Sequence, residues 1–269
     1  MEHVKQALQE DIGFGDITTE NLASDDDIIS AELNTRSNGV ICGLEVFKCV
    51  FELLCSNVDI KFYFKDGDII KKGDKIADLR GSAKALLMGE RTALNYIQRM
   101  SGIATETKKY ADEISQYKAK IADTRKTTPN FRAFEKYSVQ MGGAVMHRFN
   151  LSDCAMIKDN HIKLAGSIFE AVRILREKIS FTHKIEVECD TLDQVRCAVD
   201  SKCDIIMLDN MTLDMMSEAV DYINGRAIVE ASGNVSLERI KDIASTGVDI
   251  ISSSAIVAKA PTLDLALDM

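Results

Sequence analysis

From residue 119 onward, short apolar runs alternate with amphipathic segments in a regular order. The apolar runs are continuous, as in "KIAD", "KIEVECD" and "CDIIMLDN", which is typical of strands buried on both faces. The segments between them, such as "TLDQVRCAVDS", have apolar residues at helical spacing. The pattern predicts six strands joined mainly by helices, fewer than a complete eight-stranded barrel needs, and no glycine-rich dinucleotide turn follows the first strand. We therefore expect a small or incomplete α/β barrel.

The first part of the chain has a different pattern. Residues 58–82 alternate apolar and polar positions around Asp66-Gly67 and Gly73, which predicts antiparallel strands and tight turns. Residues 83–115 follow with helical spacing, and Ser101-Gly102 predicts a break that divides this stretch into two helices. The change of pattern predicts an N-terminal domain over residues 1–104 and a barrel domain over residues 105–269.

Composition limits the classes of protein to which the chain can belong. No apolar run is long enough to cross a bilayer, and acidic residues in "MEHVKQALQEDIG" do not suit a signal peptide. The seven cysteines form no CxxC pair, and their odd number fits poorly with a set of disulfides. A net charge of −9 argues against a nucleic-acid partner. We expect a cytoplasmic protein with no nucleic-acid or membrane partner.

Polar and charged residues follow each of the six predicted strands. In barrel enzymes the active site lies at the carboxyl ends of the strands, because the loops that follow them converge there. For one strand a polar loop would be the simpler explanation, but six in register favour a functional site. The strand-end residues are Arg125 and Lys126; Lys158 to His161; Glu188; Asp209 and Asn210; Glu230, Ser232 and Gly233; and Ser252 to Ser254.

The cations at these strand ends predict an anionic ligand. A cluster of this kind in an acidic protein is unexpected unless it binds several negative charges, because arginine pairs with carboxylate or phosphate oxygens and lysine adds a point charge. The candidate cations are Arg125, Lys126, His147, Arg148, Lys158 and His161.

Two further features predict a phosphorylated sugar as part of the ligand. Small residues in "EASGN", with Ser232 and Gly233, and in "ISSSA", with Ser253 and Ser254, allow backbone amides to approach a phosphate. The carboxylates of Glu188 and Asp209 could hold Mg²⁺, accept ribose hydroxyls, or only neutralise nearby lysines. The scattered histidines match no zinc spacing, and no serine-nucleophile elbow is present.

Eight segments in order along nearly the whole chain resemble the quinolinate phosphoribosyltransferase family, also called nicotinate-nucleotide pyrophosphorylase (carboxylating). "ADTRKTTP" and "IKDNH" within "LSDCAMIKDNHI" are the most specific. The resemblance implies an N-terminal α/β sandwich domain and a C-terminal incomplete α/β barrel. The other segments are "EDIGFGDITT", "ERTALNYIQRMSGIAT", "EKYSVQMGGAVMHR", "IEVECD", "IIMLDNM" and "EASGN".

The resemblance also implies roles for individual residues. The residues expected to grip the carboxylates of quinolinate are Arg125, His147, Arg148 and Lys158. Those expected to hold phosphoribosyl pyrophosphate and its Mg²⁺ are Lys126, Glu188 and Asp209, with Ser232 and Gly233 on a phosphate. Catalysis is then assigned to Arg125, Lys126, Lys158, Glu188 and Asp209.

The implied reaction is that of a pentosyltransferase in NAD biosynthesis. The pyridine nitrogen attacks the ribose as pyrophosphate leaves, and the 2-carboxylate departs as CO₂ to give nicotinate mononucleotide. Arg91 in "ERTALN" resembles an arginine that reaches the neighbouring subunit's site. The resemblance therefore implies a homodimer, or a hexamer built as a trimer of dimers, with shared active sites.

Four positions depart from the usual family sequence and leave alternatives open. Met146 and Asn150 flank the His-Arg pair, while Ser254 and Ala258 stand where glycine and histidine are usual. The changes near Ser254 resemble molybdenum-associated paralogues of the family. The chain could therefore act on a different anionic base, or bind a ligand in the retained pocket without turnover.

Overall fold

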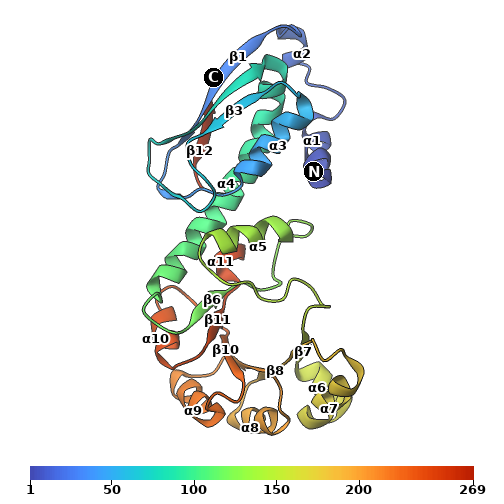
Figure 1. Ribbon diagram of the computed structural model, residues 1–269, viewed down its shortest axis with the longest axis vertical. Coiled ribbons are helices and arrows are strands. Elements are labelled where there is room, and N and C mark those ends of the chain that lie inside the picture. The colour runs from blue at the N-terminus through green and yellow to red at the C-terminus, as the bar shows by residue number, and fades with distance from the viewer. The chain divides into compact units, whose positions relative to one another are not determined.

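The computed structural model describes residues 1–269, whose contacts divide the chain into two compact units (Figure 1). Unit 1 comprises Met1–Glu106, Ala133–Gly142 and Ala260–Met269, and unit 2 comprises Thr107–Arg132 and Gly143–Lys259. The sequence pattern predicts a single boundary after residue 104, whereas the structure adds two later segments to unit 1. The C-terminal segment belongs there because its strand pairs with the first strand of the chain.

Unit 1 is an antiparallel sheet with helices packed on it. The main sheet has the strand order β12-β1-β5-β3, and β2 pairs with β4 in a separate ladder. Helix α4 (Ala83–Glu113) contributes residues to both units. The other elements are α1 (Glu2–Ile12), α2 (Thr19–Leu22), β1 (Ile28–Thr35), β2 (Gly39–Val40), α3 (Leu44–Leu54), β3 (Asp59–Phe62), β4 (Ile69–Ile70), β5 (Lys75–Ser82), α5 (Arg132–Met141) and β12 (Leu265–Asp268).

The core of unit 1 lies between this sheet and its helices. Phe47 and Phe51 of α3 are fully buried, as are Leu33 of β1 and Ile76 of β5. The predicted antiparallel strands are confirmed, since β5 pairs antiparallel with both β1 and β3. Burying these aromatic and aliphatic side chains supplies the main stabilisation of the unit, about 1.5–3 kcal/mol for each one.

Helix α4 is continuous over 31 residues, so the predicted break at Ser101-Gly102 is wrong. A Cβ atom on Gly102 would lie 1.9 Å from the carbonyl oxygen of Pro261. The hydroxyl of Ser101 donates to the carbonyl of Cys42 and accepts from its amide. Both residues are small because other chain segments approach the helix closely, and not because the helix ends there.

Unit 2 is a six-stranded parallel sheet with helices on its outer face (Figure 1). The strand order is β6-β11-β10-β9-β8-β7, which confirms the predicted series of strands and helices and the α/β class. Its elements are β6 (Lys120–Ala122), β7 (Ala155–Ile157), α6 (Asp159–Ala165), α7 (Ile168–Lys178), β8 (Ile185–Cys189), α8 (Leu192–Asp200), β9 (Ile205–Asp209), α9 (Leu213–Ile223), β10 (Ile228–Ser232), α10 (Ile240–Ser245), β11 (Ile250–Ser252) and α11 (Ala255–Ala258).

The barrel of unit 2 is incomplete, because β6 and β7 are not hydrogen-bonded to each other. Val145 forms a parallel bridge with Ala122 beside β6, which brings residues 143–148 to that edge. Helix α8 begins with a capping box formed by Thr191 and Gln194. Such caps hold each helix start close to the strand before it and so keep the carboxyl ends of the strands in register. No helix of the chain has both the length and the apolar character needed to cross a membrane.

Candidate active site

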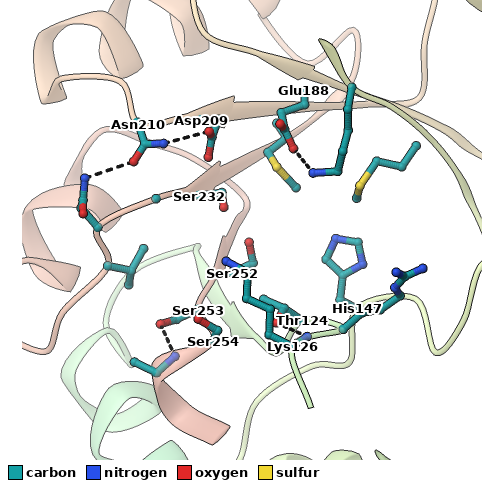
Figure 2. A pocket seen from close by; sticks show the side chains of 18 of the residues that line it. Thr124, Lys126, His147, Glu188, Asp209, Asn210, Ser232, Ser252, Ser253 and Ser254 are labelled. Atoms are coloured by element: carbon teal, nitrogen blue, oxygen red, sulfur yellow. Dashed lines mark hydrogen bonds and ion pairs between the residues drawn. The ribbon is translucent and has the colours of Figure 1, made fainter. Parts of the chain in front are cut away.

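A cavity of about 710 Å³ lies at the carboxyl ends of the strands of unit 2. Side chains from different strands face the same space (Figure 2). The sequence-predicted residues that line this cavity are Arg125, Lys126, His147, Arg148, Lys158, Glu188, Asp209, Ser232, Gly233, Ser253 and Ser254. Asn210 and Ser252, also named above as strand-end residues, line it too, together with Thr124, Met156, Met207, Asn234, Val235, Ala255 and Lys259.

Strand periodicity explains why the polar strand ends converge. Alternate residues of a strand face the same side of a sheet, so the last inward-facing position of each strand points into the cavity. Glu188 of β8, Asp209 of β9 and Ser232 of β10 occupy such positions, and Asp209 pairs in register with Ser232. The parallel ladder thus holds a row of oxygen atoms across one wall.

Arginine side chains crowd another part of the cavity. Burial, together with repulsion from Arg148 and Arg132, lowers the pKa of Arg125. The Arg148 guanidinium is held by the carbonyl oxygen of Cys154 at 2.9 Å and by the sulfur of Met156 at 3.4 Å. Like charges held together in this way favour a ligand with more than one negative charge.

The carboxylate of Glu188 lies between the cationic and anionic parts of the cavity. Its side chain is largely buried and forms an ion pair with Lys158. Nearby, burial and the negative charges of Asp159 and Asp209 raise the pKa of Asp190. This side of the cavity therefore carries excess negative charge, which suits a cation between Glu188 and Asp209.

Asparagine side chains order the loops after β9 and β10. Asn210 donates to Asp209 at 2.8 Å and accepts from the amide of Asn234 at 3.1 Å. Gly233 has φ +91°, and a Cβ atom there would lie 2.2 Å from the side-chain oxygen of Asn210. Only glycine allows the two loops to approach so closely, so this chain of amides keeps Asp209 in place without any ligand.

Serines at the end of β11 and after it form a further wall of the cavity, next to the segment that follows β6. The amide of Ser253 donates to the carbonyl of Ala122 at 3.0 Å, and the hydroxyl of Ser253 accepts from the amide of Ala255 at 3.2 Å. The loop is therefore tied to β6 and turned tightly at its tip. Such a turn presents small polar groups to a phosphate without steric hindrance.

His147 connects the cavity to two carboxylates in the barrel interior. Its Nε2 lies 3.6 Å from Glu186 and 3.4 Å from Glu230, and both glutamates are almost fully buried. The backbone amide of Arg148 donates to Nδ1 at 2.7 Å, which turns Nε2 toward the two carboxylates. These atoms lie within 4.8 Å of one another, as metal ligands would, but a protonated Nε2 is a hydrogen-bond donor and not a ligand.

Burial and charge both act on the pKa values of His147 and Glu186 in this cluster. Burial disfavours the charged imidazole, but the two carboxylates outweigh it and raise the pKa of His147 to about 10. Burial also raises the pKa of Glu186. The two buried acids therefore hold the imidazole in one orientation.

Two predicted site residues do not line this cavity. Arg91 is exposed on α4 in unit 1, whereas every lining residue belongs to unit 2. His161 lies in the first turn of α6, where its Nδ1 accepts the backbone amide of Lys158 at 3.1 Å. The imidazole of His161 thus caps the helix that begins immediately after Lys158.

The sequence reasoning missed Glu186 as part of the buried cluster and Lys259 as a cavity residue. The alternation in "IEVEC" places Glu186 on the same strand face as Glu188. That alternation was the available signal for Glu186. Lys259 follows a short helix rather than a strand, so the search for polar residues after strands could not find it.

Comparisons with known protein families match both parts of the chain. The model described as quinolinate phosphoribosyl transferase, N-terminal domain, matches residues 16–101. The model for the C-terminal domain of the same transferase matches residues 103–268. The two matches together cover most of the chain.

Similar proteins are found in bacteria. The chain is 43% identical to a probable nicotinate-nucleotide pyrophosphorylase (carboxylating) of Synechocystis, over 99% of this chain and 91% of the relative. It is 42% identical to the Bacillus subtilis protein of the same name, over 97% of this chain and 90% of the relative. The crystal structure of NadC from Streptococcus pyogenes superposes with a TM-score of 0.97 and 39% identity, covering 100% of this chain and 95% of that one.

Proposed function

The chain belongs to the quinolinate phosphoribosyltransferase family, and on that premise we propose that its cavity transfers a phosphoribosyl group to quinolinate with decarboxylation. The products are nicotinate mononucleotide, pyrophosphate and CO₂, in the biosynthesis of NAD. The observation that carries the proposal is one cavity with a crowded arginine wall, a carboxylate pair and a serine and glycine wall. These three parts match a dicarboxylate base, a metal ion and sugar phosphates.

The cationic wall binds the base. Arg125 and Arg148 present guanidinium groups that pair with carboxylates in a bidentate manner, and Lys158 adds a point charge. His147, fixed by its buried glutamates, closes this side of the cavity. Several fixed contacts orient the ring so that its nitrogen faces the sugar. We expect this orientation to account for most of the rate acceleration.

The opposite side binds phosphoribosyl pyrophosphate. Ser232, Gly233, Ser253 and Ser254 receive phosphate oxygens, and the ammonium group of Lys126 adds charge for the pyrophosphate. Since both are carboxylates at neighbouring strand ends, Glu188 and Asp209 fit Mg²⁺, which prefers oxygen ligands. When bound, this ion supplies charge neutralisation for the leaving pyrophosphate.

The chemistry needs no nucleophilic side chain. The pyridine nitrogen forms a bond to the anomeric carbon as the bond to pyrophosphate breaks, so the ring nitrogen becomes positively charged. That charge stabilises the electron pair left at the adjacent carbon when CO₂ departs, and the carbon then takes a proton. The protein contributes orientation and fixed charges that match the charge of the transition state.

The purified protein is expected to release pyrophosphate and CO₂ in equal amounts when given quinolinate, phosphoribosyl pyrophosphate and Mg²⁺. Coupled pyrophosphate detection and release of labelled CO₂ measure both products. Nicotinate in place of quinolinate serves as the control, because it forms no CO₂. Calorimetric binding of quinolinate without product would instead indicate a binding protein, and no binding would indicate a different base.

We further propose that the enzyme is a homodimer, or a trimer of such dimers, with shared active sites. Arg91 is exposed and belongs to the unit that contributes no residue to its own cavity. Phe14, Ile17 and Leu22 of the same unit are large apolar side chains that are almost fully exposed. Exposed apolar groups of this kind are typical of an interface that a second subunit covers. The seven free cysteines support the proposed cytoplasmic location.

Mixing two inactive variants tests the shared site. Arg91→Ala and Lys158→Ala are each expected to abolish activity, while a mixture of the two recovers about a quarter of the wild-type activity, because half of the randomly formed dimers contain one intact site. The measurement is pyrophosphate release after subunit exchange, with exchange confirmed by native mass spectrometry.

A matched mixture provides the control for this experiment. Lys158→Ala with Arg125→Ala changes two residues of the same subunit's cavity, so every site in the hybrid still carries one substitution. No recovery is expected from it. Equal recovery in both mixtures, or none in either after complete exchange, contradicts a site shared through Arg91.

A further inference from the structure

Lys259 is the only cation on one whole wall of the cavity. That wall is formed by the residues that β10, β11 and the segments after them contribute, and apart from Lys259 and Val235 they are small or amide side chains. The remaining lining cations come from the segments after β6 and β7 and from residues 147–148. Lys259 is therefore the one positively charged side chain that this wall offers to a ligand.

The ammonium group of Lys259 is available to a ligand. Lys158 is already paired with Glu188, and Arg148 is held by Cys154 and Met156, whereas Lys259 forms no ion pair and no side-chain hydrogen bond within the chain. Its backbone is nevertheless fixed, because its amide donates to the carbonyl of Ala255 at 3.1 Å. The backbone of Lys259 is therefore held in place, while its ammonium group has no anionic partner within the chain.

The sheet order separates Lys259 from the carboxylate pair. Glu188 and Asp209 end β8 and β9, while Lys259 follows β11, and β10 lies between β9 and β11. Two strand spacings amount to about 10 Å. If the pyrophosphate binds with Mg²⁺ at Glu188 and Asp209, the wall that carries Lys259 is free to bind the anionic group at the other end of the sugar.

We propose that Lys259 binds the 5-phosphate of phosphoribosyl pyrophosphate and so makes the site specific for a phosphorylated ribose. This inference rests on the proposed function. The serine hydroxyls and backbone amides of the wall donate hydrogen bonds to the phosphate oxygens, and the ammonium group supplies the full positive charge that these neutral donors lack.

Calorimetric binding of two ligands tests this role without requiring turnover. Nicotinate mononucleotide carries the 5-phosphate, and nicotinate riboside is the same molecule without it. Lys259→Ala is expected to weaken binding of the mononucleotide about tenfold and to leave binding of the riboside within about twofold. In steady-state assays the KM for phosphoribosyl pyrophosphate should rise by a similar factor, with the KM for quinolinate unchanged.

Two further variants complete the experiment. Lys259→Arg keeps the charge and should retain most of the preference for the mononucleotide, and Lys178→Ala, an exposed lysine on α7 outside the cavity, should change neither ligand. Equal losses for both ligands, or no loss with Lys259→Ala, would overturn the assignment. Absence of turnover in the wild type would instead count against the proposed function, while the comparison of ligands still tests Lys259.

Discussion

Arg125→Ala is expected to lower kcat/KM for quinolinate by about 10²–10³-fold, since loss of one partner of a desolvated charge pair has effects of this size. Burial and repulsion from the neighbouring Arg148 and Arg132 lower the pKa of Arg125. A bound anion would offset both unfavourable effects on its charged guanidinium. Removing the guanidinium leaves one carboxylate of quinolinate with fewer hydrogen-bond donors. The pyridine ring can then rotate, so that its nitrogen no longer points at the ribose carbon. Steady-state kinetics with each substrate varied in turn provide the measurement.

Two variants sharpen this result. Arg125→Lys retains the charge but not the planar fork, so it should recover only part of the activity. Arg173→Ala on α7 removes an arginine that pairs with Glu170 and Glu177 on the exposed helix surface, and it should leave both substrates unaffected. If Arg125→Ala raised the KM for phosphoribosyl pyrophosphate while sparing quinolinate, Arg125 would belong to the other end of the cavity.

Asp209→Asn is expected to lower kcat/KM for phosphoribosyl pyrophosphate by about 10²–10³-fold, as loss of one preorganised electrostatic contact typically does. Its carboxylate accepts from Asn210 and faces the cavity, so the substitution keeps the shape and removes the charge. The Mg²⁺ concentration for half-maximal activity should rise, because one of the two carboxylates that we propose as Mg²⁺ ligands becomes an amide. Quinolinate binding, measured by calorimetry in the absence of Mg²⁺, should remain near the wild-type value.

The matched control for Asp209 is Asp193→Asn, which removes an exposed carboxylate that pairs with Arg196 on α8. It should change neither the Mg²⁺ requirement nor the kinetics. Should Asp209→Asn show the wild-type dependence on Mg²⁺, the carboxylate pair would serve only to neutralise nearby lysines. The sequence left this role of the two carboxylates open as an alternative.

Much of the cavity could be predicted because its residues obey a local rule. A continuous apolar run marks a buried parallel strand, and the polar residues after it lie at the carboxyl edge where active sites form. Arg125, Glu188 and Asp209 follow this rule and meet in the cavity. His161 also follows a strand in sequence, but α6 begins at Asp159 and its first turn directs the imidazole to a backbone amide.

The residues that the rule could not place depend on contacts between distant segments. Glu186 lies two residues before Glu188 and, like the predicted strand-end residue Glu230, faces His147, which belongs to another segment. Lys259 enters the cavity from the end of a four-residue helix. Short-range alternation places Glu186 on the face of Glu188, but no short-range pattern encodes its contact with His147 or the entry of Lys259, since both require the assembled barrel.

By itself, the sequence determined the strand and helix order of unit 2, the polar ends of its strands and the family of the chain. These depend on side-chain periodicity within a few residues and on short motifs. Tertiary structure alone decided that α4 is continuous through Gly102, that β12 completes the sheet of unit 1, and which cations share the cavity. The physical reason is that such features arise from close approach and pairing of segments far apart in the chain, which local periodicity does not record.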